Sequence, residues 1–558
     1  MNGKIPPAIL LLLCTWLYTP QQGFAQLLKA KELYSRADSL RGQLTPYRTC
    51  YDIKYYHLDV QVDIENKYIA GSNLFRFRAT ADIDTLQFDL FDNLSLDSIS
   101  YRGEDLPFYR EYNAVFVSFP ETIVKGKLDS FVVHYSGHPI QATRAPWDGG
   151  IDWKTDSNGK PFVATACQGL GASVWWPNKD HLSDEVDSML ISVSVPHGLI
   201  NVSNGRLINR VQLPHGYDRF DWKVVNPINN YNVALNIGDY IHFEESYAGE
   251  KGSLDVSYYI LRENDNKANR SHLKQNVQRT LKAMEHWFGP YPFYEDGYKI
   301  VETAHLGMEH QSAIAYGNKF RNGYLGKDRS GSGWGSNWDF IIVHETGHEW
   351  FGNNITAADI ADMWIHEAFT NYSEALFIDY FYGKDASQAY VNGNRFTIQN
   401  DRPIQGPYDV NMEGSGDMYN KGGVILNMLR TIINDDKKWR SILRGLNSTF
   451  YHKQVNYRDI VTYINHTTGY DFTKLFQQYV QYSGLPILDI KFVNDGNIYV
   501  RWISETEDFE MPVHIGLKGS SRRLYPITNQ YQRIEIKGMT KANLDVDTFN
   551  YYIGLIVQ

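Results

Sequence analysis

The spacing of hydrophobic positions changes twice along the chain. Between residues 55 and 243, apolar and polar residues alternate in short runs separated by Gly, Asn and Pro; the runs are 58–64, 75–79, 131–135, 189–195 and 233–237. Helical spacing begins with the run at 273–288, which Gly289-Pro290 terminates. Helical patterns then dominate to residue 483. Alternation returns after residue 486, at 488–492, 499–503, 513–515 and 534–536. A period of two predicts half-buried strands, and a period near 3.6 predicts amphipathic helices.

These patterns predict an α+β multidomain protein. We expect an N-terminal antiparallel β domain at 46–246, a mainly α domain at 247–486 and a small C-terminal β module at 487–558. The 558 residues are too many for one hydrophobic core, which agrees with several domains. Residues 26–45, with leucines among polar residues, are expected to form a helical leader segment that packs loosely on the main body.

The first 25 residues have the pattern of a signal peptide. Lys4 supplies a positive charge, residues 8–18 are apolar, and 23–25 form a small-x-small site before Gln26. An uncleaved anchor is the alternative, but the apolar run is short for a bilayer span. No later run reaches transmembrane length. We therefore expect an exported protein, periplasmic or secreted, without a transmembrane segment after signal removal.

Composition excludes some classes of function. Hydrophobic residues make up 43% and charged residues 21%, which is typical of a globular protein. The net charge of −10 comes without a basic block, so a nucleic-acid partner is not expected. Beyond the signal peptide only Cys50 and Cys167 remain, which is no disulfide framework. We expect two separate thiols, although the sequence leaves their pairing open.

The candidate chemistry is concentrated between residues 343 and 367. His344 and His348 are four residues apart, so on a helix both imidazoles face one point, and Glu367 follows eighteen residues after the second histidine. Two imidazoles and one carboxylate are the ligands of a catalytic zinc site. Glu345 would then accept a proton from the attacking water. A surface helix that matches by chance is the alternative, but apolar flanks predict a buried helix, where unpaired histidines would be costly. We predict one Zn²⁺ per chain.

Four stretches together resemble the aminopeptidase N family, gluzincin-type zinc exopeptidases that include leukotriene hydrolase. Residues 344–353 (HETGHEWFGN) resemble its zinc helix, and 364–369 (WIHEAF) its third-ligand segment at the family's spacing. Residues 306–310 (LGMEH) resemble its exopeptidase motif, and 419–422 (YNKG) its catalytic tyrosine motif. The likeness runs from about residue 51 to 486. It implies a thermolysin-like zinc catalytic domain at 247–486 and a zinc-dependent aminopeptidase acting on peptides with a free N-terminus.

The resemblance also implies roles for individual residues. Glu309 would hold the substrate ammonium group, which places the first peptide carbonyl at the metal, with Gly307 and Met308 beside it in the substrate site. Tyr419 would donate a hydrogen bond to the oxyanion. Gln168 would help to bind the amino end of the substrate.

Glu374 lies seven residues after Glu367 on the same predicted helix, where it can support a ligand from behind.

The sequence departs from the family pattern in places and leaves rivals open. Leu306 and His310 replace the first glycine and the final asparagine of the exopeptidase motif, and Glu349 stands where glutamine is usual. A zinc metalloendopeptidase is one rival, which Glu309 argues against. A catalytically silent peptide-binding relative is another, which Glu345 and Tyr419 argue against. No residue indicates the epoxide hydrolysis of one family branch. The preferred N-terminal residue, natural substrates and oligomeric state are not encoded in these motifs.

Overall fold

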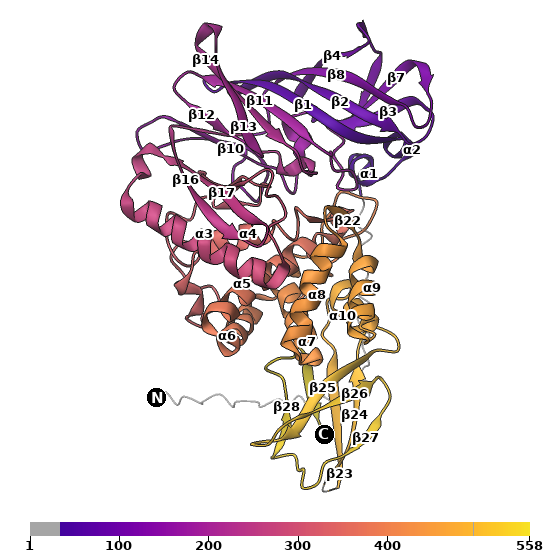
Figure 1. The fold of residues 1–558 in the computed structure, drawn as a ribbon. Coiled ribbons are helices and arrows are strands. Elements are labelled where there is room, and N and C mark those ends of the chain that lie inside the picture. Colours follow the sequence, from indigo (N-terminus) through magenta and orange to yellow (C-terminus); the bar gives the residue numbers. More distant parts are fainter. Residues whose placement is uncertain (1–33, 495) are drawn as a thin grey trace, which may run out of the picture.

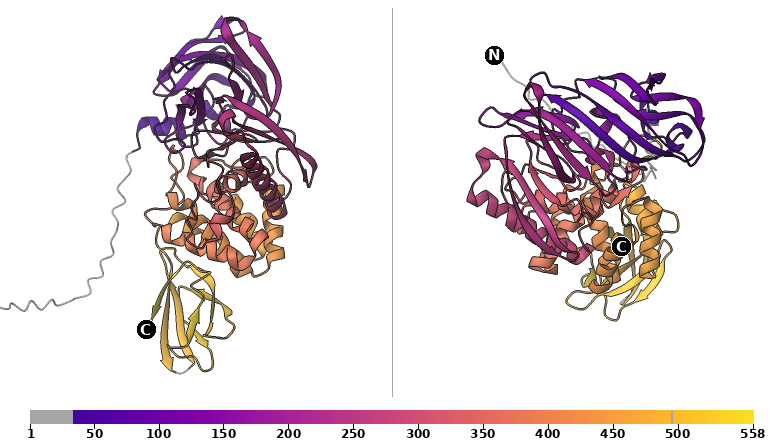
Figure 2. Two further views of the ribbon diagram at one scale, coloured as in Figure 1. Left: turned by 90° about the vertical axis from the view of Figure 1, so that its left-hand side faces the viewer. Right: turned by 45° about the horizontal axis from the view of Figure 1, so that its top comes forward.

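The structure, a computed structural model, describes residues 34–494 and 496–558. The predicted signal peptide and residues 26–33 of the predicted leader lie outside the described residues. A β-rich part, a helical part and a smaller β part follow one another along the molecule, and two further views show the same arrangement (Figures 1 and 2). This confirms the predicted fold class. Within the described ranges, no helix combines the length and apolar character required to cross a membrane.

The N-terminal β-rich part contains three sheets. The largest has the order β13-β14-β11-β1-β2-β8-β4-β5. Adjacent strands in this sheet are antiparallel, except for β1 and β11, which are parallel. Its strands are β1 Tyr51–Asp63, β2 Tyr68–Ala79, β4 Leu94–Tyr101, β5 Glu104–Asp105, β8 Leu128–Gly137, β11 Met189–Pro196, β13 Arg206–Leu213 and β14 Tyr217–Val224. The smaller sheets contain β3 Ile83–Asp89, β6 Phe108–Glu111 and β7 Ala114–Ile123, and β9 Gly150–Thr155, β10 Pro161–Ala166, β12 Ile200–Val202 and β15 Asn236–Gly238.

The alternation in β1 explains how this part builds its core. Leu58, Val60 and Val62 are fully buried, while the residues between them are partly exposed. On neighbouring strands Phe75 and Phe131 stack with their ring centroids 4.7 Å apart. Burying an aliphatic or aromatic side chain of this size stabilises the fold by roughly 1.5–3 kcal/mol.

The predicted strand at 233–237 is only partly correct, because strand β15 begins at Asn236. A 3-10 turn at Asn230–Asn232 precedes it, capped by the side chain of Asn229. The amides of residues 234 and 235 donate to side chains, Asn204 Oδ1 at 2.8 Å and Thr165 Oγ1 at 3.0 Å, rather than to a neighbouring strand. Side-chain acceptors therefore take the place of strand carbonyls at these two amides, while the Leu235 carbonyl still accepts from the Thr165 amide at 3.1 Å.

The middle part combines one sheet with a group of helices. The sheet has the order β16-β17-β18-β20-β19 and consists of β16 Tyr240–Gly249, β17 Gly252–Leu261, β18 Tyr298–Glu302, β19 Gly307–Met308 and β20 Ile314–Tyr316. The helices are α3 Lys267–Phe288, α4 Phe340–Gly347, α5 Trp364–Tyr382, α6 Lys384–Asn394, α7 Asn420–Ile433, α8 Asp436–Thr449, α9 Tyr457–Thr468 and α10 Thr473–Gln481. Short strands β21 Ile355–Ala357 and β22 Lys453–Val455 pair in parallel. The predicted domain boundary at 246 lies inside β16.

The C-terminal module is built from two small sheets. One has the order β27-β24-β23-β29 and the other β26-β25-β28. The strands are β23 Ile487–Asn494, β24 Asn497–Ile503, β25 Glu510–Leu517, β26 Arg523–Thr528, β27 Gln532–Glu535, β28 Leu544–Val546 and β29 Gly554–Val557. Tyr479 of α10 donates to the Tyr552 carbonyl at 2.8 Å, so the module is attached to the helical part.

The leader is bound more closely than the sequence predicted. Its described portion contains helix α1 Arg36–Gly42, and the short helix α2 Pro46–Thr49 follows directly after it; both lie against the first β part (Figure 1). Leu40 and Arg48 are buried, and Gln87 donates to the Leu40 carbonyl at 3.0 Å. The expectation of loose packing is therefore wrong. Cys50 and Cys167 are both buried and free.

Candidate metal centre and active site

Helix α4 carries His344, ends at His348 as its C-cap, and is fixed at its N-terminus by Asp339. The Asp339 carboxylate accepts hydrogen bonds from the amides of Ile341 and Ile342, at 3.1 and 3.3 Å. It also accepts one from the Tyr316 hydroxyl at 2.7 Å, so strand β20 holds the cap. A capping carboxylate satisfies amides that have no partner within the helix. The apolar start of α4 is thereby buried, as its sequence predicted, and the histidine pair lies inside the molecule.

Three side chains that can donate an electron pair to a metal ion, His344, His348 and Glu367, converge where α4 meets α5. We call these three residues the donor cluster. Glu367 Oε2 lies 3.8 Å from His344 Nε2 and 3.4 Å from His348 Nε2. Their ligand atoms lie within 4.8 Å of one another, and all three residues are buried. Among the described residues, Glu367 Oε2 has no hydrogen-bond partner. A buried carboxylate oxygen without a partner, facing two imidazole nitrogens, is arranged to bind a cation.

The second nitrogen of each imidazole is held from behind. His344 Nδ1 donates to Glu374 Oε1 at 2.7 Å, and the Tyr390 hydroxyl donates to Glu374 Oε2 at 2.5 Å. His348 Nδ1 lies 3.1 Å from the Phe351 carbonyl oxygen. With Nδ1 as donor, the lone pair of each Nε2 points toward Glu367, which is the tautomer that a metal ligand requires.

The electrostatics of the cluster also fit a divalent metal. Burial alone would lower the pKa of His348, but Glu367 and Glu309 outweigh it and raise that pKa to about 10. The carboxylates therefore stabilise a positive charge at this point, which a divalent metal would supply. The alternative set of Glu309, Glu345 and His348 is equally compact. It contains one imidazole rather than two, so the first set fits zinc better.

Glu345 faces the cleft on the turn between the two histidines. Burial raises the pKa of its carboxyl above its usual range. A Cβ at Gly307 would lie 2.6 Å from Glu345 Oε1 and 2.9 Å from Ile341 Cγ2, so strand β19 approaches α4 closely at this glycine. Glu345 is thus placed beside the donor cluster without being needed as one of its three ligands.

Glu309 follows β19 and is held by residues from the first β part. Its Oε1 accepts hydrogen bonds from Gln168 Nε2 at 2.8 Å and from the Tyr231 hydroxyl at 3.1 Å. Gln168 Nε2 also lies 3.1 Å from Glu367 Oε1. Asn353 Nδ2 donates to the Glu309 backbone carbonyl at 2.9 Å. Both domains therefore contribute to fixing this carboxylate.

Tyr419 lies directly before α7 and completes the ring of polar groups. Its hydroxyl donates to Glu367 Oε1 at 2.9 Å, and its ring stacks on His344 with centroids 6.0 Å apart. Burial, with Glu367 and Glu309 adding to it, holds the pKa of the phenol well above its usual range. Tyr419 therefore remains a hydrogen-bond donor over the whole physiological pH range.

The structure brings all the predicted site residues to one cleft of about 580 Å³. They are Gln168, Gly307, Met308, Glu309, His344, Glu345, His348, Glu367, Glu374 and Tyr419. The cleft lies between the first β part and the helical part. Trp147, which is 67% exposed, lies at its rim on the side of the β domain.

Three further residues at the site were not predicted from the sequence. Tyr231 holds Glu309, and Tyr390 holds Glu374. Glu413 lines the cleft without a hydrogen-bond partner among the described residues, and burial followed by the charge of Glu367 raises its pKa. The sequence offers no signal for the two tyrosines among its 39. The same holds for Glu413, whose place in the cleft depends on how the loop before Tyr419 folds.

Comparisons with known proteins agree with this geometry. Residues 273–479 match the Peptidase family M1 domain. Aminopeptidase N of Lactobacillus helveticus is 27% identical over 499 residues, 82% of this chain and 54% of the relative. Leukotriene A-4 hydrolase of Xenopus laevis is 24% identical, over 73% of this chain and 66% of the relative. Human endoplasmic reticulum aminopeptidase 1 is 24% identical over 60% of this chain, and only 36% of its own length is covered.

A solved structure shares the fold. The M1 zinc metallopeptidase of Deinococcus radiodurans, in a mutant form bound to a Tyr-Ser-Ala substrate, matches with a TM-score of 0.66 and 19% identity. The match covers 78% of this chain and 95% of that one. The matched part of this chain therefore has a fold that an M1 zinc metallopeptidase also has.

Proposed function

Because residues 273–479 match the Peptidase family M1 domain, we propose that this chain is a zinc-dependent aminopeptidase that removes N-terminal residues from peptides. The observation that carries the proposal is the position of Glu309 beside the three-donor cluster. Its carboxylate is held by Gln168 and Tyr231 in the same cleft as His344, His348 and Glu367. A fixed carboxylate near the donors binds a free ammonium group, and an internal peptide bond offers none.

The donor set would hold zinc through His344 Nε2, His348 Nε2 and Glu367 Oε2. When bound, zinc supplies a Lewis acid that polarises the scissile carbonyl and acidifies water. The two imidazoles reach it in their neutral form because Glu374 and the Phe351 carbonyl accept from their Nδ1 atoms. These supports keep both rings oriented without substrate.

The remaining residues bind the substrate and move protons. Glu309 takes the ammonium group of the substrate, which aligns the first peptide bond with Glu345. Glu345 accepts a proton from the attacking water and delivers it to the leaving amine, for which a raised carboxyl pKa is suited. Tyr419 donates a hydrogen bond to the developing oxyanion.

Strand β19 provides a further substrate contact. It is the edge strand of its sheet, and Gly307 and Met308 line the cleft. An edge strand has unpaired backbone groups that can bind an extended peptide. The signal peptide predicted for residues 1–25 supports a periplasmic or secreted location for this activity.

The test is a panel of aminoacyl chromogenic amides, assayed with and without a chelator. We expect hydrolysis of free-amino substrates, loss of activity with the chelator, and recovery with zinc at about one equivalent per chain, as one catalytic site implies. Acetylation removes the cation that Glu309 binds, and the loss of such an ion pair costs roughly 2–5 kcal/mol. Acetylated amides should therefore be poor substrates. Equal rates on acetylated and free peptides, or internal cleavage, would instead identify a metalloendopeptidase. Metal binding without turnover would identify a catalytically silent peptide-binding relative.

A further inference from the structure

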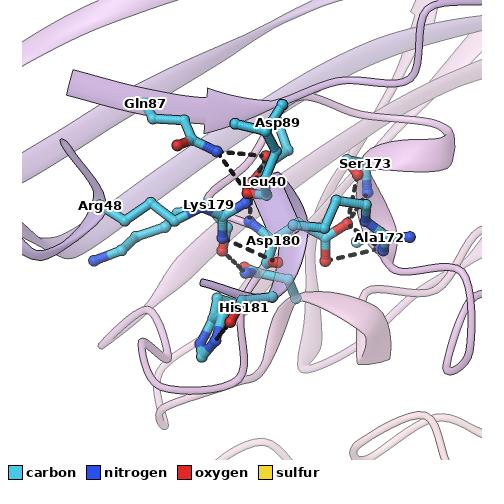
Figure 3. A network of polar contacts seen from close by, with 12 residues as sticks. Leu40, Arg48, Gln87, Asp89, Ala172, Ser173, Lys179, Asp180 and His181 are labelled. Atoms are coloured by element: carbon cyan, nitrogen blue, oxygen red, sulfur yellow. Dashed lines mark hydrogen bonds and ion pairs between the residues drawn. The ribbon is translucent and has the colours of Figure 1, made fainter. Parts of the chain in front are cut away.

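The leader helix α1 contacts both walls of the active-site cleft. On the side of the β domain, Gln87 Nε2 donates to the Leu40 carbonyl at 3.0 Å (Figure 3). His181 Nε2 donates to the Gly42 carbonyl at 3.2 Å. In helix α2 the fully buried Arg48 pairs with Asp89 at 2.6 Å. Helices α1 and α2 together are therefore anchored to the β domain at three successive points.

Asp180 connects this anchor to the loop that carries Gln168. The Asp180 amide donates to Asp89 at 3.0 Å, and its carboxylate accepts from the amides of Ala172 and Ser173 at 3.3 and 3.1 Å (Figure 3). Arg41 Nη2 lies 3.6 Å from Asp180 Oδ2 and also donates to the Leu170 carbonyl. The side chain of Arg41 is only 11% exposed. Its guanidinium thus fixes the loop at 170–173.

The fixed loop begins two residues after Gln168, whose amide group holds Glu309 and Glu367. Gly171 has a φ of +87°, and a Cβ there would lie 2.5 Å from Arg41 Nη2 and 2.2 Å from Asp180 Oδ2. The guanidinium therefore lies directly against the backbone of the loop. Arg41 and Gln168 also line the same small cavity. Displacing Arg41 would release the segment on which Gln168 is mounted.

The opposite wall of the cleft is reached from the same helix. The Asn411 amide donates to the Asp38 carbonyl at 3.3 Å. A Cβ at Gly42 would lie 2.2 Å from the backbone carbon of Val410, so the two segments are in contact through their main chains. Glu413 and residues 415–420 of this segment line the cleft, including Tyr419. One short helix thus contacts the Gln168 loop and the segment that leads to Tyr419.

We propose that α1 is a clamp across the two cleft walls and that Arg41 is a positioning residue, which holds Gln168 in contact with Glu309. The effect on turnover rests on the proposed aminopeptidase function, whereas the clamp itself does not. Arg41 belongs neither to the donor cluster nor to the residues that line the active-site cleft. It acts through the Leu170 carbonyl and Asp180.

Hydrogen–deuterium exchange tests the clamp without any assay of activity. In Arg41→Ala, the amides of residues 169–174 should exchange faster than in the unmodified protein. The control is Arg36→Ala on the same helix, because Arg36 is 55% exposed and pairs with Glu111 at 2.9 Å, away from the loop. Should Arg41→Ala fail to fold, Arg41→Lys retains the charge without the planar fork and should show a smaller increase. Unchanged exchange at 169–174 in the folded variant overturns the clamp.

A double-mutant cycle with Gln168→Ala tests the effect on the reaction. A small displacement of a positioned group can cost up to about 100-fold in rate, so Arg41→Ala should lower kcat/KM by about 5- to 100-fold while the zinc content is unchanged. If Arg41 acts through Gln168, the double variant should be no slower than Gln168→Ala alone. Additive losses, or a loss equal to that of Arg36→Ala, contradict the positioning role. An unmodified protein inactive on all amides refutes the proposed function instead, and the exchange experiment still decides the clamp.

Discussion

The carboxylate of Glu345 has no hydrogen-bond partner among the described residues, although it lies beside the donor cluster and is buried. A free buried carboxylate at this position is suited to proton transfer, since no contact has to be broken first. We expect Glu345→Gln to retain zinc and to lose about 10²- to 10⁴-fold in kcat. Metal analysis of the variant measures its zinc content, and steady-state kinetics of the same preparation measure the loss in kcat. A variant with near-normal kcat assigns proton transfer to another group.

Tyr231 donates to the carboxylate that we assign to the substrate ammonium, so its hydroxyl should affect substrate affinity and turnover. A hydrogen bond to a charged group contributes about 1.5–3 kcal/mol, which converts to roughly 10- to 100-fold in kcat/KM. We expect Tyr231→Phe to lose that amount on free-amino substrates. The matched control is Tyr247→Phe, because Tyr247 is also buried and donates to Glu285 at 2.9 Å, in a position outside the cleft. Equal kinetic losses in both variants would show that the Tyr231 hydroxyl affects activity only through the stability of the protein.

The two classes of site residue differ in how far the sequence could predict them. His344, His348 and Glu367 lie in one local pattern, where helix periodicity alone brings the histidines together. Tyr231 acquires its role only when the β domain packs on the helical part, and nothing in its local sequence encodes that contact. Glu413 is similar, because its exposure to the cleft depends on how the loop from residue 395 to 419 folds.

At the scale of elements, helix α5 organises the centre. Glu367, Thr370 and Glu374 recur at helical spacing, so one face of α5 supplies a ligand, a hydroxyl 3.1 Å from His348 Nδ1, and the carboxylate behind His344. The sequence predicted that Glu367 and Glu374 lie on one helix, with Glu374 placed to support a ligand from behind. It could not predict that Tyr390 of α6 would complete the support.

Glu374→Gln should weaken metal binding while the ligands stay unchanged. The amide cannot accept from His344 Nδ1 with the strength of a carboxylate, and removing such a support typically costs 10- to 100-fold in metal affinity. Competition with a fluorescent chelator measures the zinc affinity directly. Tyr390→Phe, which removes only the bond to Glu374 Oε2, should lose less. An unchanged affinity in Glu374→Gln would show that the ring of His344 is oriented by packing alone.

Across the whole molecule, the sequence predicted the succession of β-rich, helical and β-rich parts, because the hydrophobic period changes at each transition. The sequence patterns do not predict which contacts join these parts. The leader illustrates this: its leucines predict a helix, and Leu40 is buried, but its attachment also uses Arg41 and the Leu40 main-chain carbonyl. Polar anchoring of this kind has no period in the sequence.

The same anchoring makes the stability of the molecule depend on pH. His181 donates from Nε2 to the Gly42 carbonyl, and its Nδ1 accepts from the Ser183 amide at 3.1 Å, so the ring is held neutral. Burial, with Arg48 and Lys179 adding to it, lowers its pKa to about 3. An unfolded histidine has a pKa of about 6.5. Below that value the unfolded chain binds a proton that the folded protein does not, so this contribution to stability is complete above about pH 6.5 and is lost as the pH falls toward about 3.

His181→Gln removes the titrating group while keeping an amide that can donate to the Gly42 carbonyl. Denaturant unfolding at several pH values, followed for the unmodified protein and the variant, isolates the contribution of His181 because all other groups cancel in the difference. The stability advantage of the unmodified protein should shrink by about 1.4 kcal/mol for each pH unit below about 6, since one proton is involved. The exposed His466, replaced in the same way, provides the control. A difference that stays constant between about pH 7 and about pH 4.5 would mean that His181 accepts its proton in the folded protein without loss of the leader contact.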